Sequence, residues 1–264
     1  MHGMNGKYAK ERAGTGINVN PADLGYTATD LTITEETRHM TTAVRLSTNA
    51  GEEIEGALCE PPGSGKTGAL VVVHEGYGLN EVMKLHCEHF AQAGFLALAP
   101  DLFQGKVAKN DREMAGIMGT FNFQKAVGDI GEAVTYLRSH ARGNGRLAVA
   151  GFSLGGALTL AAARYVPALA AAVAFYGLPR LPSDEFATVK TPICGHYARV
   201  DDWANPRTVE EIQGKVRSGG GQMDVYIYDA KHGFMRSTDS STYDPKSAEL
   251  AWQRTVDFLH RHIG

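Results

Sequence analysis

The chain has 264 residues, of which 43% are hydrophobic, and a formal net charge of −3. A chain of this length and composition can bury a substantial core, and α/β folds of this size commonly form one domain. It contains no run of Lys or Arg. The charge pattern therefore argues against nucleic acid or a membrane surface as a partner and favours a small-molecule substrate.

Residues 1–40 are polar and rich in Gly, Asn and Thr, with no apolar stretch suited to a signal peptide or a membrane span. We expect them to form an N-terminal extension before a domain at residues 41–264, either docked on that domain or a second subunit, or disordered. Cys59, Cys87 and Cys194 form no C-x-x-C pair and are expected to be reduced and buried. These features favour a cytoplasmic protein, as a monomer or a homodimer.

The domain is expected to begin with an antiparallel hairpin, because residues 42–47 and 55–59 alternate in β fashion around Asn49-Ala50-Gly51. Continuous apolar runs, typical of strands covered on both faces, predict six more strands at residues 69–74, 95–99, 147–150, 170–176, 192–197 and 223–228. Helical periods lie between them, such as Val127, Ile130, Val134 and Leu137, or Trp252, Val256, Leu259 and Ile263. This alternation predicts a mostly parallel sheet with helices on both faces.

Residues 151–156 read Gly-Phe-Ser-Leu-Gly-Gly and are the most informative stretch of the chain. They follow the apolar run at 147–150 and open an alanine-rich segment, which predicts a strand, a sharp turn and a helix with Ser153 at the apex. A hydroxyl there stands clear of the sheet, and the glycines leave room for a substrate carbonyl to approach backbone N–H groups. This context, more than the bare G-x-S-x-G pattern, indicates a serine hydrolase.

A serine nucleophile needs a base to take its proton and an acid to orient that base. His232 follows the last predicted strand in a short loop containing glycine, which makes it the strongest base candidate among ten histidines. Asp201 and Asp202 follow the preceding strand and compete for the acid role; spacing does not decide between them, and we prefer Asp201. Both loops lie at strand C-terminal ends, where open α/β sheets build their sites.

An oxyanion hole needs two N–H donors, one from the residue after the nucleophile and one from the loop after an earlier strand. Leu154 supplies the first. The second candidate is Gly76, in the loop His-Glu-Gly-Tyr-Gly at residues 74–78, which follows the first long apolar strand.

Other motifs are interpreted as structural. His86 and His89 share one face of a predicted helix without a third ligand in reach, so we expect surface or boundary residues and not metal ligands. The sequence Gly65-Lys66-Thr67 resembles the end of a phosphate-binding loop, but position 60 is Glu and no helix follows. Nucleotide binding through this segment is therefore disfavoured.

The sequence resembles the dienelactone hydrolase (carboxymethylenebutenolidase) family from about residue 40 to the end, and Ser153, Asp201, His232 and the 74–78 loop carry this resemblance. The resemblance also includes residues 99–103, 151–157, 175–177 and 231–234. Several motifs in the same order are far more specific than any one of them. The resemblance implies an α/β-hydrolase fold and cleavage of small lactones or esters without a cofactor.

The resemblance implies roles for four further side chains. Glu75 is expected beside the nucleophile, and Tyr176 falls where the family places an active-site tyrosine. Arg236 matches a family arginine that binds a carboxylate of the substrate, with an ordinary surface arginine as the alternative, and Arg112 matches a second one in a looser alignment. The implied substrate is a small ester or lactone bearing a carboxylate.

The nucleophile departs from the family pattern, because the typical residue is cysteine and this chain has Ser153. The sequence does not decide whether this serine is natural or replaces a cysteine. Serine depends more strongly on its base, which makes activity on plain esters more plausible and specificity for strained lactones less so. A ligand-binding protein that keeps the fold without turnover is one alternative. A serine peptidase is another, although no propeller-sized segment is present.

Overall fold

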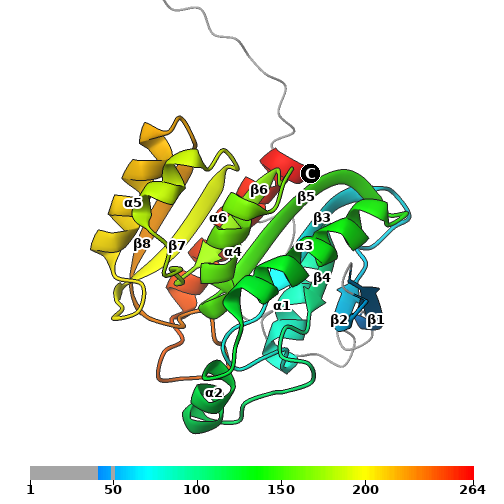
Figure 1. The fold of residues 1–264 in the computed structure, drawn as a ribbon, viewed down its shortest axis with the longest axis horizontal. Coiled ribbons are helices and arrows are strands. Elements are labelled where there is room, and N and C mark those ends of the chain that lie inside the picture. Colours follow the sequence, from blue (N-terminus) through cyan, green and yellow to red (C-terminus); the bar gives the residue numbers. More distant parts are fainter. Residues whose placement is uncertain (1–40, 49–50) are drawn as a thin grey trace, which may run out of the picture.

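The computed structural model describes residues 41–48 and 51–264, so the predicted extension at residues 1–40 lies outside the described residues. Eight strands form one sheet in the order β1-β2-β4-β3-β5-β6-β7-β8 (Figure 1). Their bounds are β1 (Thr41–Ser47), β2 (Glu53–Cys59), β3 (Thr67–Val73), β4 (Leu96–Pro100), β5 (Gly143–Phe152), β6 (Ala171–Phe175), β7 (Ile193–Val200) and β8 (Met223–Lys231).

The sheet is mostly parallel, as the alternation of strands and helices predicts. Strands β4, β3, β5, β6, β7 and β8 run parallel, whereas β1 pairs antiparallel with β2, and β2 antiparallel with β4. The predicted opening hairpin is confirmed by the β1 and β2 pairing. Because the six parallel strands share one direction, the loops after β3, β5, β7 and β8 emerge at the same edge of the sheet.

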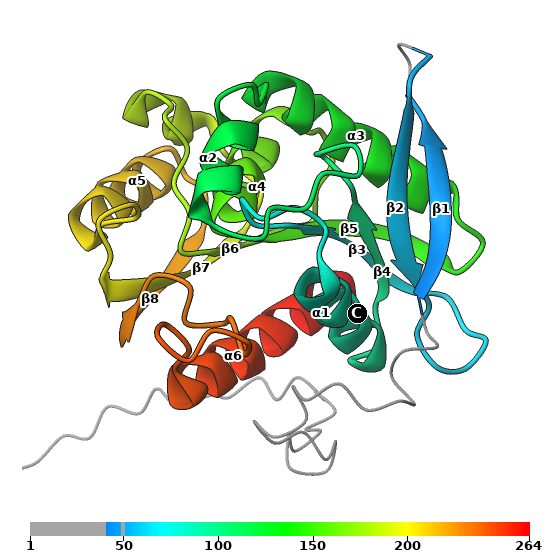
Figure 2. The ribbon, with the colours of Figure 1, turned by 90° about the horizontal axis from the view of Figure 1, so that it is seen from below.

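Helices cover both faces of the sheet. Figure 2 shows α1 and α6 on one face and α3, α4 and α5 on the other. The helices are α1 (Glu81–Gln92), α2 (Asp111–Met118), α3 (Phe123–Ser139), α4 (Leu154–Tyr165), α5 (Pro206–Ser218) and α6 (Pro245–Ile263), with a 3₁₀ helix at Ser183–Thr188. Five of them begin after an Asn or Asp whose side chain accepts an N–H bond from the first turn: Asn80, Asn110, Asn122, Asn205 and Asp244.

The core lies between these helices and the sheet. On α3, the predicted stripe of Val127, Ile130, Val134 and Leu137 is buried. On α6 half of the predicted stripe is buried: Leu259 and Ile263 are buried, whereas Trp252 and Val256 are only half-buried. The rest of the buried face consists of Ala248, Ala251, Thr255 and Phe258. The small side chains of the two alanines let the helix approach the sheet closely, which hydropathy alone does not indicate.

The expectation that His86 and His89 are surface or boundary residues is wrong. They are only 5% and 3% exposed. The His86 ring stacks on Phe152 with centroids 4.5 Å apart, and the His89 ring lies edge-on to Trp252 of α6. Burial, with a smaller effect of His89, lowers the pKa of His86 to about 3. Both rings are covered because α1 packs on the sheet directly beside α6, so His86 faces the sheet and His89 faces α6.

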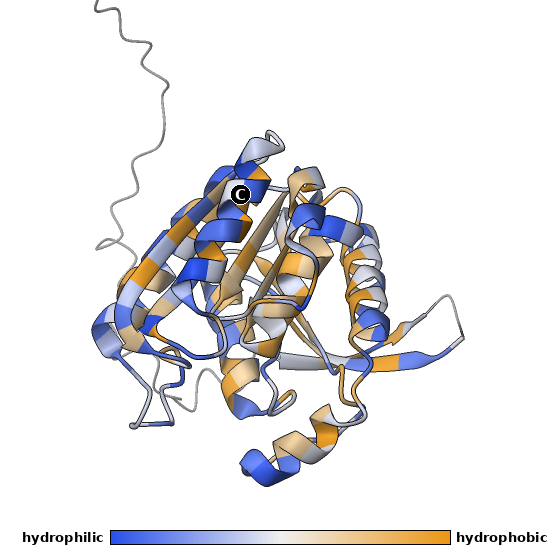
Figure 3. Cartoon of the chain, turned by 60° about the vertical axis from the view of Figure 1, so that its left-hand side comes forward, coloured by the Kyte–Doolittle hydropathy of each residue, from blue (hydrophilic) through white to orange (hydrophobic). Residues whose placement is uncertain are grey.

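Hydropathy follows this layering. Figure 3 shows mostly apolar strands in the middle of the sheet and helices that alternate apolar and hydrophilic residues. Cys59, Cys87 and Cys194 are free and buried, as predicted. Across the described part of the chain, no helix combines the length and the apolar character that crossing a membrane requires.

Candidate active site

Ser153 lies at a sharp turn between β5 and α4. Its φ of 52° and ψ of −112° are strained for a residue other than glycine. The backbones beside it leave no room for side chains. A Cβ at Gly151 would lie 2.2 Å from the carbonyl oxygen of Gly155, and one at Gly155 would lie 2.2 Å from that of Val73. The two glycines therefore let strand and helix pack closely around the turn.

The Ser153 hydroxyl faces His232 instead of capping its own helix. Serine is a favoured N-cap residue, but Ser153 makes no side-chain cap bond to α4. Its Oγ lies 2.8 Å from Nε2 of His232, and Nδ1 of His232 lies 2.8 Å from Oδ2 of Asp201. The structure thus brings three predicted side chains, from segments that follow β5, β7 and β8, into one hydrogen-bonded chain.

Asp201 is the carboxylate that reaches His232, whereas Asp202 is exposed. The backbone N–H groups of Trp203 and Ala204 donate to Oδ1 of Asp201 at 2.8 and 2.9 Å. Burial acts to raise the pKa of the Asp201 carboxyl, but the bonds from His232 and from these N–H groups outweigh burial and hold the pKa below its ordinary value. The carboxylate is therefore charged at neutral pH, with Oδ2 directed to the imidazole.

Two backbone N–H groups beside Ser153 are free to donate. Leu154 is the first residue of α4, so its N–H has no acceptor within the helix. The N–H of Gly76 donates no hydrogen bond to any described residue. These segments adjoin each other, because Gly155 packs against the carbonyl oxygens of Val73 and His74. The two donors are those that the sequence predicts for an oxyanion hole.

Glu75 lies in a buried network with Tyr176 and Arg236. The Tyr176 hydroxyl donates to Oε1 of Glu75 at 3.0 Å, and Nε of Arg236 donates to Oε2 at 2.5 Å. The Tyr176 ring packs edge-on against the His232 ring, with centroids 5.0 Å apart. Three of the four residues suggested by the family resemblance thus lie together beside His232.

Tyr176 has a constrained backbone and an unusual electrostatic environment. Its φ is 37°, and its N–H donates to the carbonyl oxygen of His196 at 2.8 Å. Burial, and then the charge of Glu75, raise the pKa of its phenol well above the ordinary value. The hydroxyl therefore keeps its proton and remains a donor to Glu75.

Helix α2 contributes contacts that the sequence analysis did not identify. The Tyr77 hydroxyl donates to Asp111 at the start of α2, and the Arg236 guanidinium lies over the Tyr77 ring, 5.2 Å from its centroid. A Cβ at Gly76 would lie 3.0 Å from Sδ of Met114, so α2 borders the 74–78 loop. These contacts join segments more than 30 residues apart, and no local sequence pattern indicates them.

Arg112 lies on the exposed surface of α2. No ion pair or hydrogen bond links it to another residue of the described chain. The structure therefore does not bring it into contact with Ser153 or Arg236, and its role in carboxylate binding stays a prediction.

A cavity of about 600 Å³ lies apart from these residues, between the hairpin, α1 and the loop after β4. Its lining includes Leu85 and Glu88 but none of the three side chains of the hydrogen-bonded chain. The chemistry of the side chains therefore locates the candidate site better than cavity size does. Within residues 41–48 and 51–264, no three His, Cys, Asp or Glu side chains are grouped so that they could hold a metal ion.

Known proteins resemble the chain over most of its length. The sequence model of the Dienelactone hydrolase family matches residues 54–263. "Protein usf" of Aquifex pyrophilus is 31% identical, over 81% of this chain and 95% of that protein. A "Putative carboxymethylenebutenolidase" of Aquifex aeolicus is 29% identical, with the same coverage of each chain.

The fold has close structural neighbours as well. A crystal structure from Klebsiella pneumoniae, named "Putative Dienelactone Hydrolase", has a TM-score of 0.75 and 25% identity, over 82% of this chain and 96% of that chain. The predicted α/β-hydrolase fold is thereby confirmed. The chain belongs to the dienelactone hydrolase family, a family of carboxylic ester hydrolases.

Proposed function

We propose that the protein hydrolyses a small carboxylic ester or lactone through an acyl-enzyme on Ser153. In the first half-reaction, Nε2 of His232 takes the hydroxyl proton while Oγ bonds to the substrate carbonyl carbon. His232 then gives this proton to the alkoxy oxygen as the ester C–O bond breaks. Asp201 orients the ring through Nδ1–H and stabilises the positive charge that forms on it.

In the second half-reaction, water releases the acyl group. His232 takes a proton from water as its oxygen attacks the acyl carbon, and returns the proton to Ser153 Oγ when the acyl–oxygen bond breaks. The N–H groups of Gly76 and Leu154 hold the carbonyl oxygen while it carries negative charge in each tetrahedral intermediate. No step requires a cofactor.

The observation that carries this proposal is the pair of 2.8 Å contacts from Ser153 to His232 and from His232 to Asp201. The contacts use both ring nitrogens, so a proton on Nδ1 leaves Nε2 free to accept from the hydroxyl. The charged state of Asp201 supports that tautomer. The strained turn at Ser153 supports a nucleophile held clear of its helix.

We also propose that the substrate carries a carboxylate near Arg236. Nε of Arg236 is bonded to Glu75, while its two terminal nitrogens make no hydrogen bond to a described residue. A guanidinium with free terminal donors suits a carboxylate. The lactone named in carboxymethylenebutenolidase relatives such as that of Aquifex aeolicus carries a carboxylate of this kind.

The test is a pre-steady-state burst with a nitrophenyl ester. We expect the wild type to release about one equivalent of nitrophenol in the burst, and Ser153→Ala to release none, because no acyl-enzyme can form. Ser139→Ala, which alters an exposed serine at the end of α3, is the matched control and should keep the full burst. Unchanged turnover in Ser153→Ala would contradict the proposal.

A further inference from the structure

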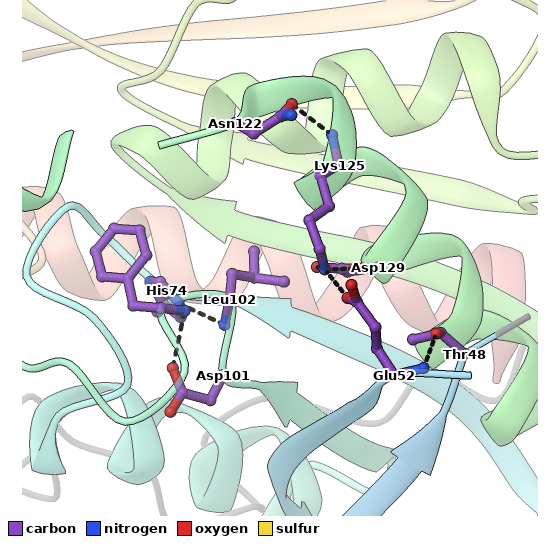
Figure 4. A network of polar contacts seen from close by, with 9 residues as sticks. Thr48, Glu52, His74, Asp101, Leu102, Asn122, Lys125 and Asp129 are labelled. Carbon is purple, nitrogen blue, oxygen red and sulfur yellow. Dashed lines mark hydrogen bonds and ion pairs between the residues drawn. The ribbon is translucent and has the colours of Figure 1, made fainter. Parts of the chain in front are cut away.

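His74 is a buried residue whose ring joins two loops at the site. It follows β3 directly and is 0% exposed. Its Nδ1 lies 2.8 Å from the carbonyl oxygen of Glu75. The backbone N–H of Leu102 donates to its Nε2 at 3.1 Å, a bond that Figure 4 shows. Both ring nitrogens are therefore used, and neither partner belongs to the chain that links Ser153, His232 and Asp201.

These partners fix the tautomer of the ring. An N–H group can only donate, so Nε2 must be unprotonated, and the ring proton is on Nδ1 and donates to the Glu75 carbonyl. Burial lowers the pKa of His74, against the opposing effects of its bond to the Glu75 carbonyl and of the Asp101 and Glu75 charges. A neutral ring fits both hydrogen bonds.

The surroundings of His74 hold the ring in place. The Phe103 ring packs edge-on against it, with centroids 4.7 Å apart. The Asp101 carboxylate accepts the N–H groups of Phe103 and Gly105 at 3.0 and 2.6 Å, which fixes the turn that carries Leu102. The ring is thus braced by the loop after β4 while its Nδ1 holds the loop after β3.

The geometry of one peptide group connects this ring to the oxyanion hole. The carbonyl of Glu75 and the N–H of Gly76 belong to the same planar trans peptide, so they point in opposite directions. The carbonyl oxygen is held by His74 and by the N–H of Gly78, at 2.8 and 3.1 Å. The Gly76 N–H is consequently turned away from His74, and it donates to no described residue.

We propose that His74 is a positioning residue for the oxyanion hole: its Nδ1–H fixes the Glu75–Gly76 peptide so that the Gly76 N–H faces the oxyanion formed at Ser153. This inference rests on the proposed function. His74 touches neither the substrate nor the reacting atoms, and it acts only through the orientation of that peptide. A preoriented donor stabilises developing charge without reorganising during the reaction.

Two near-isosteric variants separate the two hydrogen bonds of His74. In His74→Asn the side-chain nitrogen lies near the place of Nδ1 and can donate to Glu75, but nothing accepts from Leu102. In His74→Gln the side-chain oxygen reaches the place of Nε2 and can accept from Leu102, but nothing donates to Glu75. Each variant loses one buried hydrogen bond, so a purely structural role predicts similar losses of stability and activity in both.

We expect the two variants to differ in catalysis. His74→Gln should lower kcat for a nitrophenyl ester about 10- to 100-fold with little change in KM, since a misplaced oxyanion donor weakens binding of the transition state alone. His74→Asn should stay within about threefold of the wild type. A trifluoromethyl ketone, which forms a tetrahedral adduct with serine, should lose affinity for His74→Gln by a similar factor to kcat.

Equal losses of kcat in both variants, or losses that follow the melting temperature, would overturn the inference. Unchanged kcat in His74→Gln would also overturn the inference. If Ser153→Ala nevertheless abolishes the burst, the proposed function stands without the role of His74. If Ser153→Ala keeps full turnover, the proposed function fails. Nitrogen-15 NMR of the wild type needs no variant: His74 should be neutral with its proton on Nδ1, and a proton on Nε2 would refute the geometry.

Discussion

Two regions of the molecule each bring together a histidine, a tyrosine and an arginine, but within the described chain only one of them also contains hydrogen-bonded carboxylates. At the strand ends, His232, Tyr176 and Arg236 lie with the carboxylates of Asp201 and Glu75. Between the sheet and α6, His196 bonds through Nδ1 to Tyr228 at 2.8 Å and through Nε2 to Thr255 at 2.9 Å, and Arg254 donates to Tyr228. No carboxylate bonds to His196 within the described chain.

The difference shows which features suit a histidine to proton transfer. The His232 side chain is 20% exposed and links a carboxylate to a serine hydroxyl. His196 is 0% exposed, and burial, with the charge of Arg254 adding to it, lowers its pKa to about 3. His196 resists protonation, and its side-chain hydrogen bonds go only to hydroxyl groups and to the Cys194 thiol, which suits a role in holding the core together. A histidine that links a carboxylate to a hydroxyl has the partners that proton transfer requires.

The largest effect should separate the two histidines. We expect His232→Gln to lower kcat on a nitrophenyl ester about 10⁴- to 10⁶-fold with little change in melting temperature, because the base is lost. His196→Gln should change kcat less than about threefold but cost about 1–3 kcal/mol of unfolding free energy, since buried hydrogen bonds are lost. Comparable losses of kcat in the two variants would erase the distinction.

The acid gives the next largest effect. Asp201→Asn should lower kcat about 10³- to 10⁴-fold, because an amide no longer favours the Nδ1–H tautomer of His232 or stabilises its charged form. Asp202→Asn removes a neighbouring exposed carboxylate and should change kcat less than about threefold. Steady-state kinetics of both variants provides the measurement, and a larger loss in Asp202→Asn would reassign the acid.

The arginines should differ in substrate binding. Arg236→Ala should raise KM about 10- to 100-fold for an ester that bears a carboxylate, and less than about threefold for its neutral analogue, since a charged hydrogen bond is lost. Arg254→Ala changes the half-buried arginine of α6 and should leave both KM values unchanged. Arg112→Ala, at the surface of α2, should give a smaller effect than Arg236→Ala. An equal rise for the acidic and the neutral ester would argue against carboxylate binding by Arg236.

The last prediction concerns stability and pH, and leaves catalysis aside. The pKa of His196 falls from 6.5 to about 3 on folding, so the unfolded chain takes up this proton first as the solution is acidified. The contribution of a neutral His196 to the free energy of unfolding is complete above about pH 6.5 and is lost as pH falls toward 3. Wild-type stability should therefore fall more steeply than that of His196→Gln, by up to about 1.4 kcal/mol per pH unit. Parallel denaturation curves between pH 7 and 4 would exclude this titration.

The order of the elements could be predicted because the signals are local. Apolar runs mark the buried parallel strands, and Gly151–Gly156 carries the whole turn around Ser153 within six residues. His232 and the pair Asp201 and Asp202 could be chosen because the C-terminal ends of parallel strands meet at one edge of the sheet, but only the structure distinguishes Asp201 from Asp202. The rule predicts that His232 and Asp201, 31 positions apart, lie at the same edge of the sheet. In the structure, Nδ1 of His232 lies 2.8 Å from Oδ2 of Asp201.

Features that depend on how helices cover one another could not be predicted. His86 and His89 are ordinary helix positions in the sequence, and only the packing of α1 on the sheet and beside α6 buries them. The contacts of α2 with Tyr77 and Gly76 also follow from packing, because α2 buries no residue of its own. The two hydrogen bonds of His74 could not be predicted either, because the ring joins the loop after β3 to the loop after β4.

Mapping the site of covalent modification tests the central claim most directly. The wild type is treated with one equivalent of a fluorophosphonate, digested and sequenced by mass spectrometry, with Ser153→Ala and His232→Gln in parallel. We predict one adduct, on Ser153, formed rapidly in the wild type, absent in Ser153→Ala and much slower in His232→Gln. An adduct on another residue that abolishes ester hydrolysis, or ester hydrolysis that persists when Ser153 is fully modified, would contradict the account.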